Sequence, residues 1–186
     1  MSDLHPVRKE RVYLTGFMGS GKSTIGPILA NTIGYDFVDV DRSIETTVGK
    51  TVNRIFRDHG EEYFRILERK LIAQLSTTPH MVISLGGGTI ADPENFRLIS
   101  GTGILVYLKT TPEQLFRRLH HKSDRPVLRT EEGEQLPEEE LRTRILDLYN
   151  RREPFYAKAD IVVQTDEVKV GKTVDQIVRK LSHYIQ

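Results

Sequence analysis

One glycine-rich segment, Gly16-Phe17-Met18-Gly19-Ser20-Gly21-Lys22-Ser23, constrains the fold more than any other feature of this sequence. It fits the pattern G-x-x-x-x-G-K-[ST] in full, between the apolar run Val12–Leu14 and a helix-like segment from Thr24 to Thr32. Such glycines let backbone N–H groups converge on phosphate oxygens, and a helix N-terminus adds partial positive charge. The alternative is a glycine-rich turn that merely precedes a helix. We predict that the segment binds a nucleoside triphosphate.

Two side chains of this segment have distinct expected roles. Lys22 would offset the charge of the β- and γ-phosphates, and the Ser23 hydroxyl would coordinate Mg²⁺, a hard cation that prefers oxygen ligands. Guanine-binding proteins usually carry an Asn/Thr-Lys-x-Asp segment after a later strand, which this sequence lacks. ATP is therefore the expected nucleotide. The residues expected to bind it are Gly19, Ser20, Gly21, Lys22, Ser23 and Thr24.

Short apolar runs rich in Val and Ile recur along the chain, each followed by a helix-like segment. They are Val12–Leu14, Phe37–Val40, Met81–Leu85, Gly103–Leu108 and Ile161–Val163. Continuous apolarity indicates strands buried on both faces, as in a parallel sheet crossed by helices. The chain of 186 residues is therefore predicted to be a single α/β domain, closed by a helix from about Thr173 to Tyr184.

Composition excludes several classes of protein. The 27 Lys and Arg against 26 Asp and Glu give a net charge of +1, which argues against a nucleic-acid binder. No apolar stretch approaches the roughly 18–20 residues of a membrane span, and residues 1–11 lack the apolar segment of a secretory signal. The absence of cysteine excludes disulfides and thiolate zinc sites, and it favours a cytoplasmic protein. We expect a monomer, because no clear self-association patch is visible.

A pair of carboxylates follows the second apolar run, in Asp39-Val40-Asp41. Ligands bind at the carboxyl ends of the strands in open α/β sheets. Alternate residues point the same way if the strand stays extended, so one carboxylate could reach Mg²⁺ through water while the other holds a substrate hydroxyl. The alternative is that Asp41 only caps a helix starting near Arg42.

Arg152 lies at an unusual position in a predicted helix. In a helix from Pro137 to Tyr156, Arg152 continues the apolar stripe of Leu141, Ile145 and Leu148, a costly position unless an anion meets it. A frayed helix end that reaches solvent is the alternative.

Arg65 lies in an expected helix from Glu61 to Leu75, whose apolar stripe is Phe64, Leu67, Leu71 and Leu75. Glu61 and Glu68 can both orient its guanidinium. Surface ion pairs of this kind, worth about 0.2–0.5 kcal/mol, are the alternative reading.

Two further segments carry glycine or unusual charge. Gly86-Gly87-Gly88 follows the third apolar run and lets a ligand approach the main chain, although a flexible turn is the alternative. Residues 120–137 show neither helical nor strand periodicity and are expected to form a mobile lid. Arg125 in that lid could reach the transferring phosphoryl group, or it could be solvated charge in a loop.

Taken in order, these motifs resemble the shikimate kinases over nearly the whole chain, from Arg11 to the C-terminus. The resemblance rests on Gly16–Thr24, Asp39–Glu45, Ile55-Phe56, Gly60-Glu61, Phe64–Glu68, Ser84–Gly88, Arg125–Leu128 and Arg152–Tyr156. It implies a three-layer α/β/α fold of the nucleoside monophosphate kinase type, with a five-stranded parallel sheet. It also implies Mg²⁺- and ATP-dependent phosphorylation of the shikimate 3-hydroxyl, in chorismate and aromatic amino acid biosynthesis.

The resemblance further implies a role for each matching residue. Asp41 would bind the reacting hydroxyl and accept its proton, and Lys22 and the lid residue Arg125 would act on the phosphates. Arg65 and Arg152 would clamp the substrate carboxylate, Gly86, Gly87 and Gly88 would contact substrate through the backbone, and Ser23 and Asp39 would serve the magnesium site. The segment from Thr165 to Lys169 only roughly fills the adenine-contacting position, and the acidic stretch from Glu131 to Glu140 has no assigned role.

Two other functions compete with this one. A related small-molecule kinase, such as one acting on gluconate, is disfavoured by Phe64-Arg65 and by the triple glycine. A regulatory module that only senses ligand would be expected to have lost Lys22, Asp41 or Arg125, and all three are present.

Overall fold

The computed structural model describes residues 9–120, 128, 134, 136–166 and 168–184. The strands are β1 (Arg11–Thr15), β2 (Asp36–Asp39), β3 (Met81–Ser84), β4 (Ile104–Lys109) and β5 (Ile161–Gln164). The helices are α1 (Lys22–Ile33), α2 (Val40–Val48), α3 (Val52–Leu75), α4 (Pro93–Thr102), α5 (Pro112–Leu119), α6 (Glu138–Tyr156) and α7 (Val170–Leu181), with a 3₁₀ turn η1 (Thr89–Ala91). All five predicted strands are therefore present.

The strands form one parallel sheet in the order β2-β3-β1-β4-β5. β1 is central, and Tyr13 lies opposite Ile83 of β3 and Leu105 of β4. Beyond the end of β1, the amide of Leu85 donates to the carbonyl of Leu14 over 2.9 Å. The loops that follow β1 and β3 are therefore neighbours, although about 70 residues separate them in the chain.

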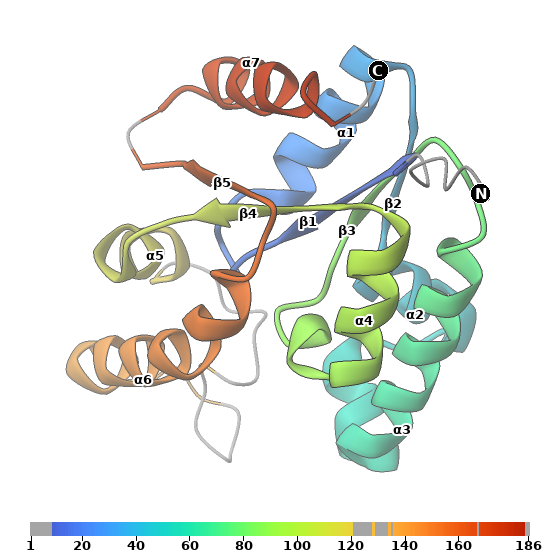
Figure 1. Ribbon diagram of the computed structural model, residues 1–186. Coiled ribbons are helices and arrows are strands. Elements are labelled where there is room, and N and C mark those ends of the chain that lie inside the picture. The colour runs from blue at the N-terminus through green and yellow to red at the C-terminus, as the bar shows by residue number, and fades with distance from the viewer. Residues whose placement is uncertain (1–8, 121–127, 129–133, 135, 167, 185–186) are drawn as a thin grey trace.

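Alternation along the strands divides the core into two layers. Val12 and Leu14 pack toward α1 and α7, whereas Tyr13 packs on the opposite face with residues of α3, α4 and α6. Figure 1 shows the same arrangement, with α1 and α7 on one side of the sheet and α3, α4 and α6 on the other. The expectation of a three-layer α/β/α fold is confirmed.

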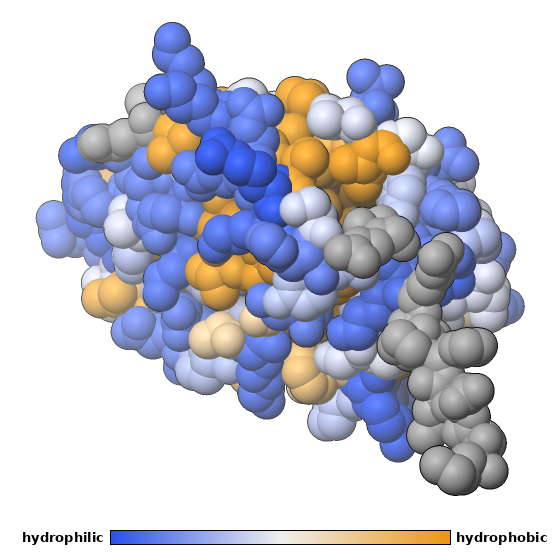
Figure 2. Space-filling model, turned by 45° about the horizontal axis from the view of Figure 1, so that its top comes forward, coloured by the Kyte–Doolittle hydropathy of each residue, from blue (hydrophilic) through white to orange (hydrophobic). Residues whose placement is uncertain are grey.

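The surface agrees with this burial pattern. Figure 2 shows one face of the molecule, which carries mostly hydrophilic side chains with apolar side chains in smaller patches. No helix in the described part of the chain is long and apolar enough to cross a membrane.

Several expected boundaries differ from the observed ones, most of them by one or two residues. The run Phe37–Val40 ends one residue early, because Asp39 caps α2 and Val40 is already helical. α3 begins at Val52 rather than near Glu61, and it contains a break at Gly60, whose φ of 81° suits a residue without a side chain. The final helix begins at Val170 and ends at Leu181.

The predicted lid at 120–137 falls largely outside the described residues. Within it, His120 follows α5, and Leu128 and Leu136 are buried in the core. Arg125 is not among the described residues, so its expected contact with the phosphates stays a prediction.

Candidate active site

A large cleft opens at the carboxyl-terminal edge of the sheet. Its volume is about 1770 Å³, well above the roughly 300–1,000 Å³ typical of a site for one small ligand. It is lined by residues of the phosphate-binding segment, the start of α2, one side of α3, the triple glycine and α6. The cleft therefore has room for a nucleotide and a second substrate side by side.

The loop after β1 forms one end of this cleft. Gly16 has a φ of 143°, and a Cβ atom there would lie 2.7 Å from the carbonyl oxygen of Leu108, so a larger residue does not fit. The Lys22 ammonium donates to the carbonyls of Gly16 at 2.7 Å and Phe17 at 3.1 Å. In the described part of the chain, the buried Ser20 hydroxyl has no hydrogen-bond partner. A polar ligand in the loop could satisfy that group.

The proposed magnesium residues meet directly. The Ser23 hydroxyl donates to Asp39 Oδ2 over 3.0 Å, while Asp39 Oδ1 accepts the Arg42 amide at the start of α2. Within the described ranges, no group of three or more His, Asp or Glu side chains is placed to hold a metal. These oxygen donors fit Mg²⁺, which often binds one or two protein ligands and takes the rest from phosphates and water.

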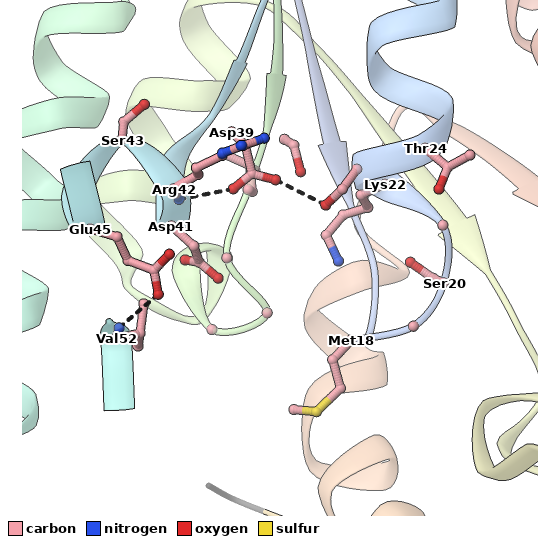
Figure 3. A pocket seen from close by; sticks show the side chains of 18 of the residues that line it. Met18, Ser20, Lys22, Thr24, Asp39, Asp41, Arg42, Ser43, Glu45 and Val52 are labelled. Carbon is pink, nitrogen blue, oxygen red and sulfur yellow. Dashed lines mark hydrogen bonds between the residues drawn. The ribbon is translucent and has the colours of Figure 1, made fainter. Parts of the chain in front are cut away.

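Asp41 is not the helix cap that we considered as an alternative, because Asp39 has that role. Asp41 lies instead in the first turn of α2, where the helix dipole favours a negative charge. Figure 3 shows Asp41 on the opposite side of the pocket from Lys22, with Asp39 between them and hydrogen-bonded to Ser23. Both carboxylates line the cleft, as expected. The expected cause, alternation along an extended strand, is wrong, because the strand ends at Asp39 and Asp41 is already in α2.

Arg65 is held by two glutamates on its own helix. Its guanidinium contacts Glu61 and Glu68 at 2.8 Å each, and Glu68 is fully buried. The second carboxylate oxygen of Glu68 accepts the Thr89 hydroxyl over 2.6 Å. Burial lowers the pKa of Arg65, but both glutamates together raise it above its ordinary value. The alternative that Arg65 forms only surface ion pairs is therefore wrong for its contact with the buried Glu68.

The stripe predicted for this helix also needs correction. Phe64 and Leu75 are buried as expected, but Glu68 and Ile72 occupy buried positions, while Leu67 and Leu71 are only partly buried. The buried glutamate is tolerated because Arg65 and Thr89 satisfy its oxygens.

Arg152 faces the cleft from an unbroken helix, so the frayed-end alternative is wrong. α6 continues to Tyr156 through Pro154, and Arg152 is partly buried. Its guanidinium carbon lies 5.9 Å from the ring centroid of Phe17, which follows the first glycine of the phosphate-binding segment. Arg152 thus lies close both to the phosphate-binding segment and to Gly87.

The triple glycine lies beneath three charged side chains. A Cβ atom would lie 2.7 Å from Asp41 Oδ1 at Gly86, 2.9 Å from an Arg152 nitrogen at Gly87, and 2.8 Å from an Arg65 nitrogen at Gly88. Each glycine therefore leaves space for a different ionised group. A flexible turn without a ligand would not need a glycine beside each of these three side chains. A binding site that brings the three side chains together does need them.

Sequence reasoning missed Arg118. Its guanidinium donates to the carbonyls of Gly19 at 3.1 Å and Thr165 at 3.0 Å, and thereby ties α5 to the phosphate-binding loop and to the segment after β5. The neighbouring Arg117 is exposed and pairs with Glu113. Nothing in the sequence distinguishes these two adjacent arginines.

The segment from Thr165 to Lys169 was expected to lie near adenine. Two of its residues, Thr165 and Val168, line the cleft.

A parallel sheet with a phosphate-binding loop after its first strand, and a cluster of ionised side chains in the same cleft, defines a P-loop phosphotransferase of the nucleoside monophosphate kinase type. Comparison with known proteins narrows this class. The family model "Shikimate kinase" matches residues 18–182. This chain belongs to the shikimate kinase family.

Individual relatives agree with that membership. A shikimate kinase of Chlorobaculum parvum is 48% identical over 94% of both chains, and that of Chlorobaculum tepidum is 49% identical over 94% of this chain and 92% of its own. The shikimate kinase structure from Acinetobacter baumannii, in complex with shikimate, has a TM-score of 0.85 at 30% identity and covers 97% of each chain. A gluconokinase from Sinorhizobium meliloti shares the fold, with a TM-score of 0.58 at 18% identity, 95% coverage of this chain and 93% of its own.

Proposed function

We propose that this chain transfers the γ-phosphoryl group of ATP to the 3-hydroxyl of shikimate, giving shikimate 3-phosphate and ADP. The observation that carries the proposal is the convergence of Asp41, Arg65 and Arg152 on three consecutive glycines beside the phosphate-binding loop. A hydroxy acid needs cations for its carboxylate and an acceptor for its reacting hydroxyl. Because Asp41 repels the carboxylate, the substrate binds with its hydroxyl end toward Asp41.

The reaction follows from this orientation. Asp41 accepts the proton of the 3-hydroxyl while that oxygen forms a bond to the γ-phosphorus of ATP. The bond from the γ-phosphorus to the bridging oxygen breaks, and ADP leaves. Lys22 and Arg125 offset the charge on the transferring group, so catalysis rests on positioning and electrostatics.

Ser23 and Asp39 would hold Mg²⁺. When bound, the ion neutralises phosphate charge. Support comes from the oxygen-only character of the two side chains and from their 3.0 Å contact beside the loop. A cytoplasmic, monomeric enzyme that needs no nucleic acid or membrane completes the proposal.

The decisive experiment measures ADP release with Mg²⁺ and ATP, with and without shikimate. We expect release that depends on shikimate and that is not restored by gluconate. Release with gluconate alone supports the polyol-acid kinase instead. Shikimate binding by calorimetry without any ADP release supports a ligand sensor.

A further inference from the structure

Tyr156 ends α6 directly beneath the triple glycine, and none of the roles proposed above involves it. Its side chain is 1% exposed, and its hydroxyl donates to the carbonyl oxygen of Gly87 over 2.6 Å. That contact joins two segments 69 residues apart in the chain. The hydroxyl thus contacts the middle glycine of the loop on which the charged groups converge.

The same hydroxyl is close to Arg152. Tyr156 is one helical turn after Arg152, so both side chains share a face of α6. A Cβ atom on Gly87 would lie 2.9 Å from an Arg152 nitrogen and 3.6 Å from the Tyr156 oxygen. Gly87, Arg152 and Tyr156 therefore form one packed group.

The ring of Tyr156 is held in place by an aromatic contact with the sheet. It contacts the ring of Tyr107 on β4 with a centroid distance of 5.3 Å, and both side chains belong to the buried core. Burial raises the pKa of Tyr156 to about 12, against the opposing effect of Arg152. The hydroxyl consequently stays protonated and able to donate at neutral pH.

Holding the Gly87 carbonyl has a consequence for the next residue. A trans peptide is planar, so its carbonyl and the following N–H point in opposite directions. The described chain contains no cis peptide bond. The Tyr156 contact therefore sets the direction of the Gly88 N–H as well as the space available to Arg152.

We infer that Tyr156 is a positioning residue for acceptor binding: its hydroxyl fixes the Gly87–Gly88 peptide and the Arg152 guanidinium relative to each other. This inference rests on the proposed function, since it assigns Tyr156 to the carboxylate end of the shikimate site. It does not place Tyr156 in contact with substrate or with the reacting atoms.

The test is Tyr156→Phe, which keeps the ring and removes the hydroxyl. Loss of one buried hydrogen bond predicts a rise in the shikimate KM of about fivefold to tenfold, with the ATP KM and kcat within about twofold of the unchanged enzyme. Tyr149→Phe is the matched control. Tyr149 is also a buried tyrosine of α6, but its hydroxyl meets that of Tyr107 at 3.3 Å. The control should leave the shikimate KM unchanged.

Two outcomes overturn the inference: an unchanged shikimate KM in Tyr156→Phe, or an equal rise in both KM values. A double-variant cycle adds a second readout. In an Arg152→Ala background, Tyr156→Phe should raise the shikimate KM by a smaller factor than it does in the unchanged enzyme, because one of the two groups that it positions is gone. A full additional rise there contradicts action through Arg152. If the unchanged enzyme releases no ADP with shikimate, the proposed function fails, which is distinguishable from failure of this inference.

Discussion

The two halves of the cleft are built in different ways. In the proposed assignment, the phosphate-binding part of the nucleotide half comes from one continuous segment, Gly16–Ser23, which supplies a lysine, a serine and backbone groups. The acceptor half takes Asp41 from α2, Arg65 from α3 and Arg152 from α6, and gathers them over Gly86–Gly88. A local segment creates the first half, and long-range packing creates the second.

This difference has a functional meaning. Backbone groups in one loop can bind phosphate whatever the acceptor is, so the nucleotide half is generic to P-loop proteins. Specificity for an acceptor requires charged groups at set positions, and these are supplied by separate elements. Substitutions in the acceptor half should therefore alter acceptor kinetics while ATP binding survives.

The largest expected effect is that of Asp41→Asn. Loss of a general base typically costs about 10²- to 10⁴-fold in rate, so kcat should fall by that order. The ATP dissociation constant, measured by calorimetry, should stay within about twofold, because Asp41 lies across the cleft from Lys22. Near-normal turnover would show that Asp41 has no role in the reaction. It would also contradict the assignment of Asp41 to the acceptor half of the cleft.

Next in size is the effect of Arg152→Ala. A charge-assisted hydrogen bond is worth about 1.5–3 kcal/mol, which corresponds to a rise of roughly 10- to 150-fold in the shikimate KM. The ATP KM should change far less. Arg151→Ala is the control, since Arg151 is the adjacent, exposed arginine of the same helix. Steady-state kinetics decide, and equal effects on both substrates contradict the carboxylate clamp.

Single alanines in the triple glycine should separate the acceptor functions. At Gly87 a new Cβ meets the end of the flexible Arg152 side chain, which can move. At Gly86 it meets Asp41 first, at 2.7 Å, and then the buried Glu68 and Thr89 side chains at 3.0 and 3.1 Å. Gly87→Ala displaces Arg152 and should raise the shikimate KM about tenfold, whereas Gly86→Ala displaces Asp41 and should lower kcat by about as much.

Gly101→Ala is the control for this pair, because a Cβ atom there has no heavy atom within 4 Å. It should leave both kinetic parameters unchanged. If Gly86→Ala and Gly87→Ala have the same kinetic signature, the three glycines do not serve separate side chains.

The smallest effect is expected outside the cleft, at Asp92. Asp92 caps α4 through the amides of Glu94 and Asn95 and pairs with Arg69 at 3.1 Å. Asp92→Ala should lower the free energy of unfolding by about 1 kcal/mol, as helix caps do, without altering either KM. Urea unfolding and kinetics on the same sample measure both.

The pH dependence of this loss has a definite sign. Burial alone raises the pKa of Asp92, but the Asn95 amide and Arg69 bring it below the ordinary value of 3.8. The stabilisation is therefore full above that value and is lost as the pH falls through the lower folded pKa. The difference between Asp92→Ala and the unchanged protein should shrink below about pH 4, and a constant difference contradicts a charged cap.

The sequence determined the strands, the phosphate-binding loop and the class of fold, because these depend on local patterns of apolar residues and glycine. The resemblance to the shikimate kinases pointed to Asp41, Arg65 and Arg152, which line one cleft, and their roles there stay predictions. Tertiary structure alone decided what surrounds them. Glu68 is fully buried because Arg65 and Thr89 satisfy it, and Asp39 rather than Asp41 caps α2 because the strand ends one residue earlier than its apolar run. Arg118 and Tyr156 act on segments 99 and 69 residues away, and no local spacing records contacts of that range.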